Sequence, residues 1–119
     1  DILTGKIPDG VKKLVLSPSS DQAEVRLFLE ENDYEITDER FVRDRGKHYQ
    51  IIAAVPGHME LTSLEREFGP LIIKEKSREF TEYMQKQISK LEKAALLAKN
   101  PEEKEKIRQR IDILKGLMT

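Results

Sequence analysis

Cysteine is absent from this chain of 119 residues. Its absence excludes disulfide bonds and thiolate metal sites, and it agrees with a reducing compartment. No apolar run approaches the roughly 20 residues that a membrane-spanning helix needs, and no signal-peptide pattern opens the sequence. Aromatic residues make up 6% of the chain and charged residues 36%, which indicates a soluble protein with much solvated helix surface. We therefore expect a cytoplasmic protein with no membrane partner.

The residue patterns of common catalytic and cofactor sites are missing as well. No nucleophile with a base, no pair of acids and no metal cluster occurs at a recognised spacing. His48 and His58 are isolated, so both are expected to be structural or solvated. No glycine-rich phosphate loop occurs, because the glycines stand singly at Gly5, Gly10, Gly46, Gly57, Gly69 and Gly116. We expect this chain alone to hold no metal and no nucleotide cofactor.

Charge is unevenly distributed although the net charge is only -1. Residues 1–76 carry 11 basic and 15 acidic side chains, whereas residues 77–119 carry 10 and 7. A basic C-terminal part favours an anionic partner, because phosphate contacts draw on lysine and arginine. Mixed charge on exposed helices is also an ordinary means of staying soluble, and charge alone favours that explanation.

The first third of the chain predicts a strand followed by a helix. Val11–Leu16 is a short aliphatic run after the turn signal Pro8-Asp9-Gly10, which suits a buried strand. The spacing from Ser19 to Gln22 is that of a capping box, so a helix should begin there. The helix should close at Asn32-Asp33 in a left-handed conformation. We expect the buried stripe of this helix to consist of Val25, Leu27, Phe28 and Leu29. Its outward face should carry Glu24, Arg26, Glu30 and Glu31.

A β-hairpin is predicted next. Tyr34–Asp44 alternates imperfectly between apolar and polar residues, so a bulge or break is expected near Asp38. Asp44-Arg45-Gly46 is a turn signal, because glycine adopts positive φ at little cost. The partner strand, Lys47–Val55, becomes continuously apolar from Ile51 onward, which is typical of a strand covered on both faces.

The remainder is predicted to be mainly helical. Thr62 and Glu65 have capping-box spacing and predict a short helix, Ser63–Phe68, that ends at Gly69-Pro70. An aliphatic link, Leu71–Ile73, then leads to a helix over Arg78–Lys99 that Ser77 caps.

The two C-terminal helices carry apolar residues at alternating spacings of four and three, the pattern of a coiled-coil seam. Asn100-Pro101 separates the first helix from the second, Glu102–Met118, and so short a connection makes them antiparallel neighbours. The seam residues are Met84, Ile88, Leu91, Ala95 and Ala98 in the first helix, and Ile107, Ile111, Leu114 and Met118 in the second.

One stretch of the sequence resembles a known domain junction. From Phe68 to Ser77 it reads FGPLIIKEKS. The bacterial tRNA adenine-22 methyltransferases join a Rossmann-like domain to a coiled-coil domain through FGP, two or three aliphatic residues and EKS. The patterns Ile2-Leu3-x-x-Gly5 and Lys13-Leu14-Val15-Leu16-x-Pro18, together with the helical hairpin, extend the resemblance over nearly the whole chain.

The resemblance implies an α/β fold. The chain would be the C-terminal fragment of a Rossmann-like methyltransferase sheet, built as strand, helix and β-hairpin, followed by an antiparallel helical coiled-coil hairpin. The last strand would lie antiparallel between the two before it. Residues 1–60 would belong to the methyltransferase domain, residues 61–76 to the junction and residues 77–119 to the coiled coil.

The resemblance also implies a chemistry. The family transfers a methyl group from S-adenosylmethionine to ring nitrogen 1 of an adenine in tRNA. Its glycine-rich cofactor loop and its catalytic loop would lie upstream of Asp1, so we assign no catalytic and no cofactor-binding residue to this chain and expect no bound S-adenosylmethionine in it. A first residue other than Met also suggests a piece of a longer protein. The chain departs from the family's Leu-Gln-Pro-Asn at Leu16-Ser17-Pro18-Ser19, and it therefore lacks the amide at that strand end.

The candidate tRNA contacts are basic side chains. Lys86, Lys90 and Lys93 fall on one face of the first long helix, where they could meet phosphates. Arg43 and Arg45 cluster at the tip of the β-hairpin, where an ordinary polar turn is the favoured explanation and an RNA contact the alternative.

Two alternatives remain open from the sequence. An exposed sheet edge beside Leu14–Leu16, or the helical hairpin, could join two copies of the chain into a homodimer. The chain could also be a non-enzymatic coiled-coil module that binds a protein or its own copy, since the apolar seam and the small net charge suit that role.

Overall fold

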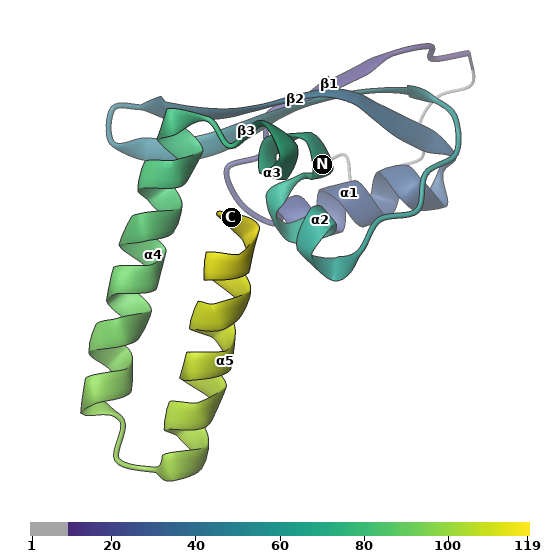
Figure 1. Ribbon diagram of the computed structural model, residues 1–119. Coiled ribbons are helices and arrows are strands. Elements are labelled where there is room, and N and C mark those ends of the chain that lie inside the picture. The colour runs from purple at the N-terminus through teal and green to yellow at the C-terminus, as the bar shows by residue number, and fades with distance from the viewer. Residues whose placement is uncertain (1–9) are drawn as a thin grey trace. The chain divides into compact units, whose positions relative to one another are not determined.

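The computed structural model describes residues 10–119 of the chain. The chain divides into two compact units, one ending at Glu75 and the other running from Lys76 to Thr119 (Figure 1). The Ile2-Leu3 and Pro8-Asp9 patterns lie outside the described residues. The finer division into residues 1–60, 61–76 and 77–119 stays a prediction.

The first unit contains a three-stranded sheet in the order β1-β3-β2. Its strands are β1 (Leu14–Leu16), β2 (Tyr34–Asp44) and β3 (Lys47–Pro56). The α/β class is therefore confirmed, and so is the implied strand order, because β3 lies between the other two and pairs antiparallel with both. Strand β1 is shorter than the predicted run from Val11 to Leu16.

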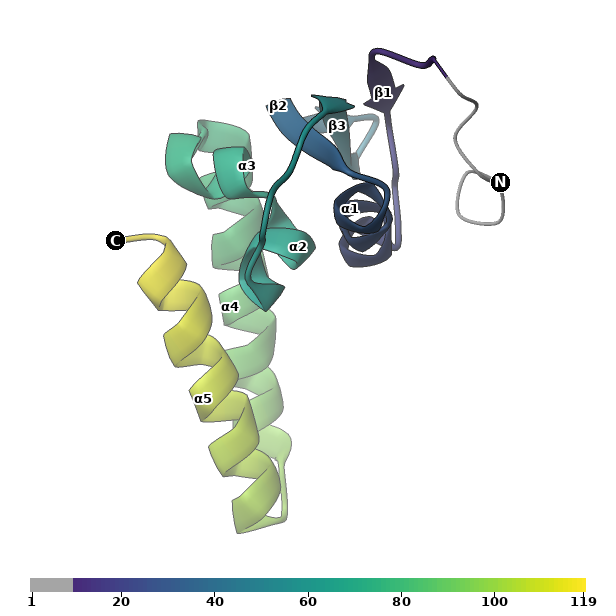
Figure 2. The same ribbon diagram turned by 90° about the vertical axis from the view of Figure 1, so that its right-hand side faces the viewer.

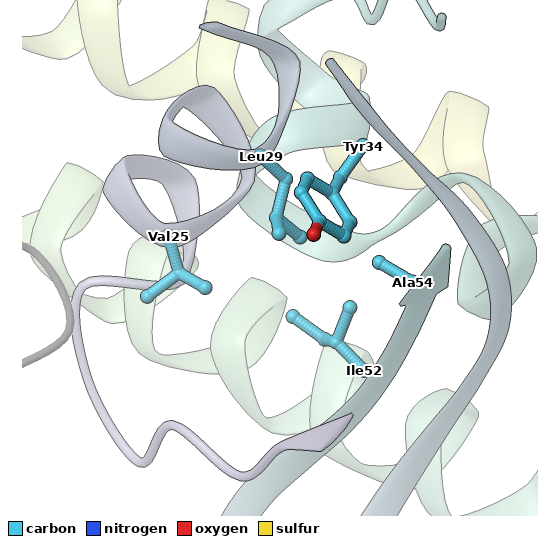
Figure 3. Packing of buried hydrophobic residues seen from close by; sticks show 5 residues of the cluster. All are labelled: Val25, Leu29, Tyr34, Ile52 and Ala54. Atoms are coloured by element: carbon cyan, nitrogen blue, oxygen red, sulfur yellow. The ribbon is translucent and has the colours of Figure 1, made fainter. Parts of the chain in front are cut away.

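Helix α1 (Gln22–Glu31) packs on one face of this sheet. Val25 and Leu29 of the helix meet Tyr34, Ile52 and Ala54 of the strands in the hydrophobic core (Figure 3). Each large aliphatic side chain buried in this way contributes about 1.5 to 3 kcal/mol. The Tyr34 hydroxyl donates to the Val11 carbonyl oxygen at 2.6 Å, so its polar end is also satisfied.

Strand β3 is buried mainly on the side of that core. Ile52 and Ala54 are fully buried, whereas Ile51, Ala53 and Val55 are half-buried. Successive side chains of a strand point to opposite faces, and α1 covers only one of them. Within residues 10–119 helix α1 covers one face of β3, and the prediction of a strand covered on both faces stays a prediction.

The start of α1 differs from the predicted capping box. The residue before the helix is Asp21, which has φ 57° and makes no capping hydrogen bond through its side chain. Ser19 lies too early to cap, because the left-handed turn at Asp21 places the first helical residue at Gln22. The predicted closure is confirmed, since the Asn32 amide donates to the Phe28 carbonyl at 3.1 Å and Asp33 has φ 57°.

The β-hairpin follows the sequence pattern closely. The register of β2 and β3 shifts between Ile36 and Asp38, which confirms the predicted bulge. Arg45 and Gly46 have φ of 51° and 79° at the turn. Two consecutive positive φ values match the right-handed twist of the flanking strands.

Two short helices end the first unit. Helix α2 (Ser63–Phe68) has the predicted capping box: the Thr62 hydroxyl accepts from the Glu65 amide at 3.2 Å, and the Glu65 carboxylate accepts from the Thr62 amide at 2.9 Å. Residues 71–73, predicted as a link, lie instead within helix α3 (Pro70–Glu75). Proline suits the first turn of a helix, so Pro70 starts α3. The sequence had predicted only that the preceding helix ends at Gly69-Pro70.

The second unit is an antiparallel pair of helices, α4 (Arg78–Leu97) and α5 (Pro101–Leu117) (Figures 1 and 2). The Ser77 hydroxyl caps α4 as predicted, by accepting from the Phe80 amide at 3.2 Å. Met84, Ile111 and Leu114 of the predicted seam are buried, and its other members are half-buried. The supercoil of a coiled coil stays a prediction. Within residues 10–119, every helix is too short or too polar to cross a bilayer.

Candidate nucleic-acid interface

Three lysines form a row along α4. Lys86, Lys90 and Lys93 are all exposed, and their spacing of four and three places them on one face of the helix. The seam residues Met84 and Leu91 lie about half a turn away at the same levels. The lysine row, as we call these three residues, therefore points away from α5.

The lysine row is not neutralised by neighbouring carboxylates. Among residues 10–119, no ion pair joins a carboxylate to Lys86, Lys90 or Lys93. Glu82, one turn before Lys86, instead accepts a hydrogen bond from Arg78 at 3.1 Å. The three ammonium groups thus remain available for phosphate oxygens.

The two candidate arginines lie at the tip of the β2–β3 hairpin. Arg43 pairs across the ladder with His48, and Arg45 occupies the turn. Both side chains are exposed. The structure thus gathers the lysines on one helix face and the arginines at one turn, in two different units. Contact of either group with RNA stays a prediction.

The sequence patterns did not predict a buried polar network that lies near the start of α3. Arg26, predicted to face outward, is fully buried and forms an ion pair with the fully buried Glu39 at 2.8 Å. Arg26 Nη2 also donates to Gln50 Oε1 at 2.6 Å, and Nη1 donates to the Arg66 carbonyl at 2.9 Å. The network therefore joins α1, both long strands and α2.

The Glu39 carboxylate also holds the start of α3. Its Oε1 accepts from the backbone amides of Leu71 at 2.7 Å and Ile72 at 3.3 Å. These amides lie in the first turn of the helix, where backbone donors lack partners within the helix and an anion is favoured. Within the described residues, every buried side-chain nitrogen and oxygen has a hydrogen-bond partner.

The same network explains the FGP signature. Gly69 has φ 96°, a conformation that disfavours any residue with a Cβ. A Cβ there would lie 2.5 Å from Arg26 Nη2 and 2.8 Å from Glu39 Oε1. Phe68 before it is buried, and Pro70 after it opens α3. The motif thus brings the chain close against a buried ion pair.

A second ion pair links α1 to α2. Arg66 Nε donates to Glu30 Oε1 at 2.6 Å, and the Leu61 amide donates to Glu30 Oε2 at 3.2 Å. Glu30 was predicted to face solvent, but its side chain is only 11% exposed. The hydrogen bond from Arg66 is the main cause that lowers the pKa of Glu30.

Burial dominates the ionisation of the buried pair. It raises the pKa of Glu39, and the charge of Arg26 together with the amides of α3 opposes this effect. Burial likewise lowers the pKa of Arg26, and Glu39 opposes that change. Each charge is therefore tolerated inside the unit because the other compensates it.

A hint of this network exists in the sequence. Arg26 directly follows a core position of the α1 stripe, and Gln50 alternates with Ile52 and Ala54 along β3. Polar residues next to or in register with core positions are candidates for buried pairs. Leu27 shows the opposite error, because it was assigned to the buried stripe and is 41% exposed.

The described residues do not gather the side chains that a metal ion would need. Residues 10–119 contain no cluster of His, Asp and Glu suited to a metal ion. The glycine turns at Gly46 and Gly69 serve the hairpin and the α3 junction. One open groove of about 310 Å³ lies between the two long helices, and its lining mixes both charges: Glu92, Ala95, Arg108, Ile111, Asp112 and Lys115.

Known proteins resemble this chain along most of its length. The sequence profile of the TrmK family, tRNA (adenine(22)-N(1))-methyltransferase, matches residues 3–116. A solved protein of the NADB-Rossmann superfamily from Streptococcus agalactiae is 32% identical with a TM-score of 0.79, and the match covers 93% of this chain and 49% of that one. No curated protein matches the chain.

A second relative carries a functional description. Sp1610 of Streptococcus pneumoniae, a candidate tRNA (m1A22) methyltransferase, is 31% identical with a TM-score of 0.82, over 92% of this chain and 50% of that one. Its structure in complex with S-adenosyl-L-methionine matches with 29% identity and a TM-score of 0.79, over 93% of this chain and 49% of that one. The chain thus spans about half the length of these solved proteins.

Proposed function

Because the chain belongs to the tRNA (adenine(22)-N(1))-methyltransferase family, we propose that it is part of an enzyme that methylates ring nitrogen 1 of an adenine in tRNA. The observation that carries this proposal is the family match over residues 3–116. It favours an enzyme over the non-enzymatic coiled-coil module. S-adenosylmethionine, which the Streptococcus pneumoniae relative binds, would supply the methyl group. Its binding site would lie outside residues 10–119, and the compartment would be the cytoplasm.

The first unit would serve this enzyme as scaffold. Its sheet and the network of Arg26, Glu39 and Gln50 hold α1, α2 and α3 in fixed positions. A buried pair that bonds to several elements at once has few alternative arrangements, because any shift leaves a charge uncompensated. The network would thus fix the geometry with which the chain leaves the sheet.

The second unit would hold the tRNA. The lysine row is exposed, unpaired by carboxylates and directed away from α5, so its three charges can meet the same stretch of RNA backbone. Arg43 and Arg45 would add contacts from the hairpin tip. Both groups would bind phosphate, which fixes the position of the RNA without reading its sequence.

Removing the lysine row tests this role. In the full-length enzyme, Lys86, Lys90 and Lys93 changed together to Ala should weaken tRNA binding, and the slope of log K against log salt should flatten by roughly two to three. The matched control changes three exposed lysines of the first unit, Lys12, Lys13 and Lys74, to Ala, which removes the same net charge. Equal losses in the two variants would show that only overall charge matters and would refute the row as a binding site.

Self-association is a second candidate, favoured by one observation. Strand β1 lies at the edge of the described sheet, and its Val15 side chain is 61% exposed. An exposed aliphatic edge can pair with another strand. Light scattering of the full-length protein over a range of concentrations distinguishes the cases, because a constant monomer mass rules out a homodimer.

A further inference from the structure

Two exposed leucines lie at the far end of the helix pair. Leu96 and Leu97 occupy the last turn of α4, and their side chains are 83% and 80% exposed. The other exposed large hydrophobic residues among those described are Val15, Leu27 and Ile113, with exposed fractions between 41% and 61%. The seam of the helix pair does not use the two leucines. They form the apolar tip, as we call this pair of residues.

The apolar tip continues the lysine row. Leu97 lies four residues after Lys93, so it falls on the same face as Lys86, Lys90 and Lys93. Leu96 lies beside it, and the exposed Lys99 follows in the loop. A polyanion that lies along the row would therefore reach two apolar side chains at its end.

The tip is held by local hydrogen bonds rather than left loose. The Ala98 amide donates to the Ala94 carbonyl at 3.0 Å, which closes the last turn of α4. The Asn100 side chain accepts from the Glu102 amide at 2.8 Å and so starts α5. Both leucines are thus presented on an ordered helix end, so their backbone need not become ordered when something packs on them.

We propose that the apolar tip packs against an unpaired base of the RNA whose phosphates the lysine row holds. The inference rests on the proposed tRNA-binding role and adds to it the kind of RNA feature that is contacted. Charge complementarity favours a nucleic acid, because three unpaired ammonium groups lead directly to the tip. Leucine can pack on the face of a base that is not stacked in a helix, and such bases occur in the loops and bulges of folded RNA.

The test separates the apolar contact from the phosphate contact. Binding of the full-length enzyme is measured with a tRNA transcript and with a blunt RNA duplex of equal length, at several salt concentrations. Leu96 and Leu97 changed together to Ala should weaken tRNA binding about tenfold, because the shortened side chains no longer cover the apolar face of the base. Duplex binding and the salt slope should stay unchanged. Ile113→Ala, at an exposed position of α5, is the control and should change neither.

A fluorescent variant reports the contact directly. Leu97→Trp places an indole at the tip, and its emission should be quenched by the tRNA but not by the duplex, because stacking on a base requires an unpaired one. Ile113→Trp should show no such quenching. Both positions are exposed, so neither change removes core packing.

Each outcome decides between specific explanations. If the leucine variant binds tRNA normally while the lysine variant does not, the base contact is wrong and the lysine row stands. If neither variant is affected, both proposals fail. Equal weakening for tRNA and duplex, or a change only in the sedimentation mass without RNA, would overturn the base contact. The second of these results would identify another copy of the protein as the partner of the tip.

Discussion

The unit that ends at Glu75 contains a buried polar network beside its hydrophobic core, whereas the interior of the helix pair from Lys76 to Thr119 is a repeating apolar seam. In the first unit, Arg26 and Glu39 are fully buried and bond to three other elements. In the second, Ile111 and Leu114 are buried between two capped helices.

The difference concerns how each unit tolerates change. A buried ion pair needs both partners, because the loss of one leaves a charge without compensation. An apolar seam accepts residues of similar volume at modest cost. We therefore expect conservative substitutions to lower the unfolding free energy more in the polar network of the first unit than in the seam of the second. The loss should be larger for a side chain with more hydrogen-bond partners.

The largest effect is expected from Glu39→Gln. It preserves shape but removes the charge that compensates Arg26, so unfolding free energy should fall by about 3 to 5 kcal/mol. Urea denaturation measures the loss. Glu35→Gln, at an exposed position of the same strand, should cost less than about 0.5 kcal/mol. Similar values for the two variants would mean that the network contributes little.

The seam is tested by Leu114→Ala, which should lower unfolding free energy by about 2 to 5 kcal/mol, because the side chain is 2% exposed. Leu114→Met should cost less than about 1.5 kcal/mol. The neighbouring Ile113→Ala, at a 43% exposed position, serves as the control. The contrast between the units is lost if Leu114→Met proves as costly as Glu39→Gln.

Glycines sharpen the comparison further. Gly69→Ala should cost about 1 to 3 kcal/mol from its positive φ, and more from the close approach to Arg26. Gly46→Ala shares the positive φ but meets nothing within 4 Å, so the difference between the two isolates the contact. Gly116→Ala, inside α5, should instead stabilise by about 0.5 to 1 kcal/mol. Thermal unfolding ranks the three variants, and equal effects at positions 69 and 46 would argue against crowding at the network.

The smallest effect concerns acid. The pKa of Glu30 is lowered in the folded protein, mainly by the hydrogen bond from Arg66. Ionised Glu30 therefore stabilises the folded protein at pH values above the pKa that Glu30 has in the unfolded chain. This stabilisation is lost as the pH falls through the lower pKa of Glu30 in the folded protein. Glu30→Gln should lower the unfolding midpoint at pH 7 and lose its effect in strong acid. A midpoint difference that does not change with pH would contradict this account, and Glu105→Gln, on exposed helix surface, provides the baseline.

Much of the candidate RNA surface was accessible from the sequence, because it depends on helix periodicity. The spacing of Lys86, Lys90 and Lys93 fixes a common face once the helix is assigned. The predicted seam residues of both long helices are buried or half-buried. The same periodicity places Leu97 on the face of the lysine row, away from the seam. The sequence did not reveal that α4 ends at Leu97, two residues before the predicted Lys99, which puts both leucines in its last turn.

Local chemistry allowed the sequence by itself to determine several of the helix starts and one turn of this protein. The capping box at Thr62, the cap at Ser77 and the turn at Arg45-Gly46 are built from residues a few positions apart, so neighbours in the chain suffice to specify them. Only the tertiary structure decided that Arg26 and Glu39 are buried, that Pro70 begins a helix at the junction, and that one face of β3 is covered. The physical reason is that a charge can be buried only where a distant part of the chain supplies its partner, and no local pattern encodes that meeting.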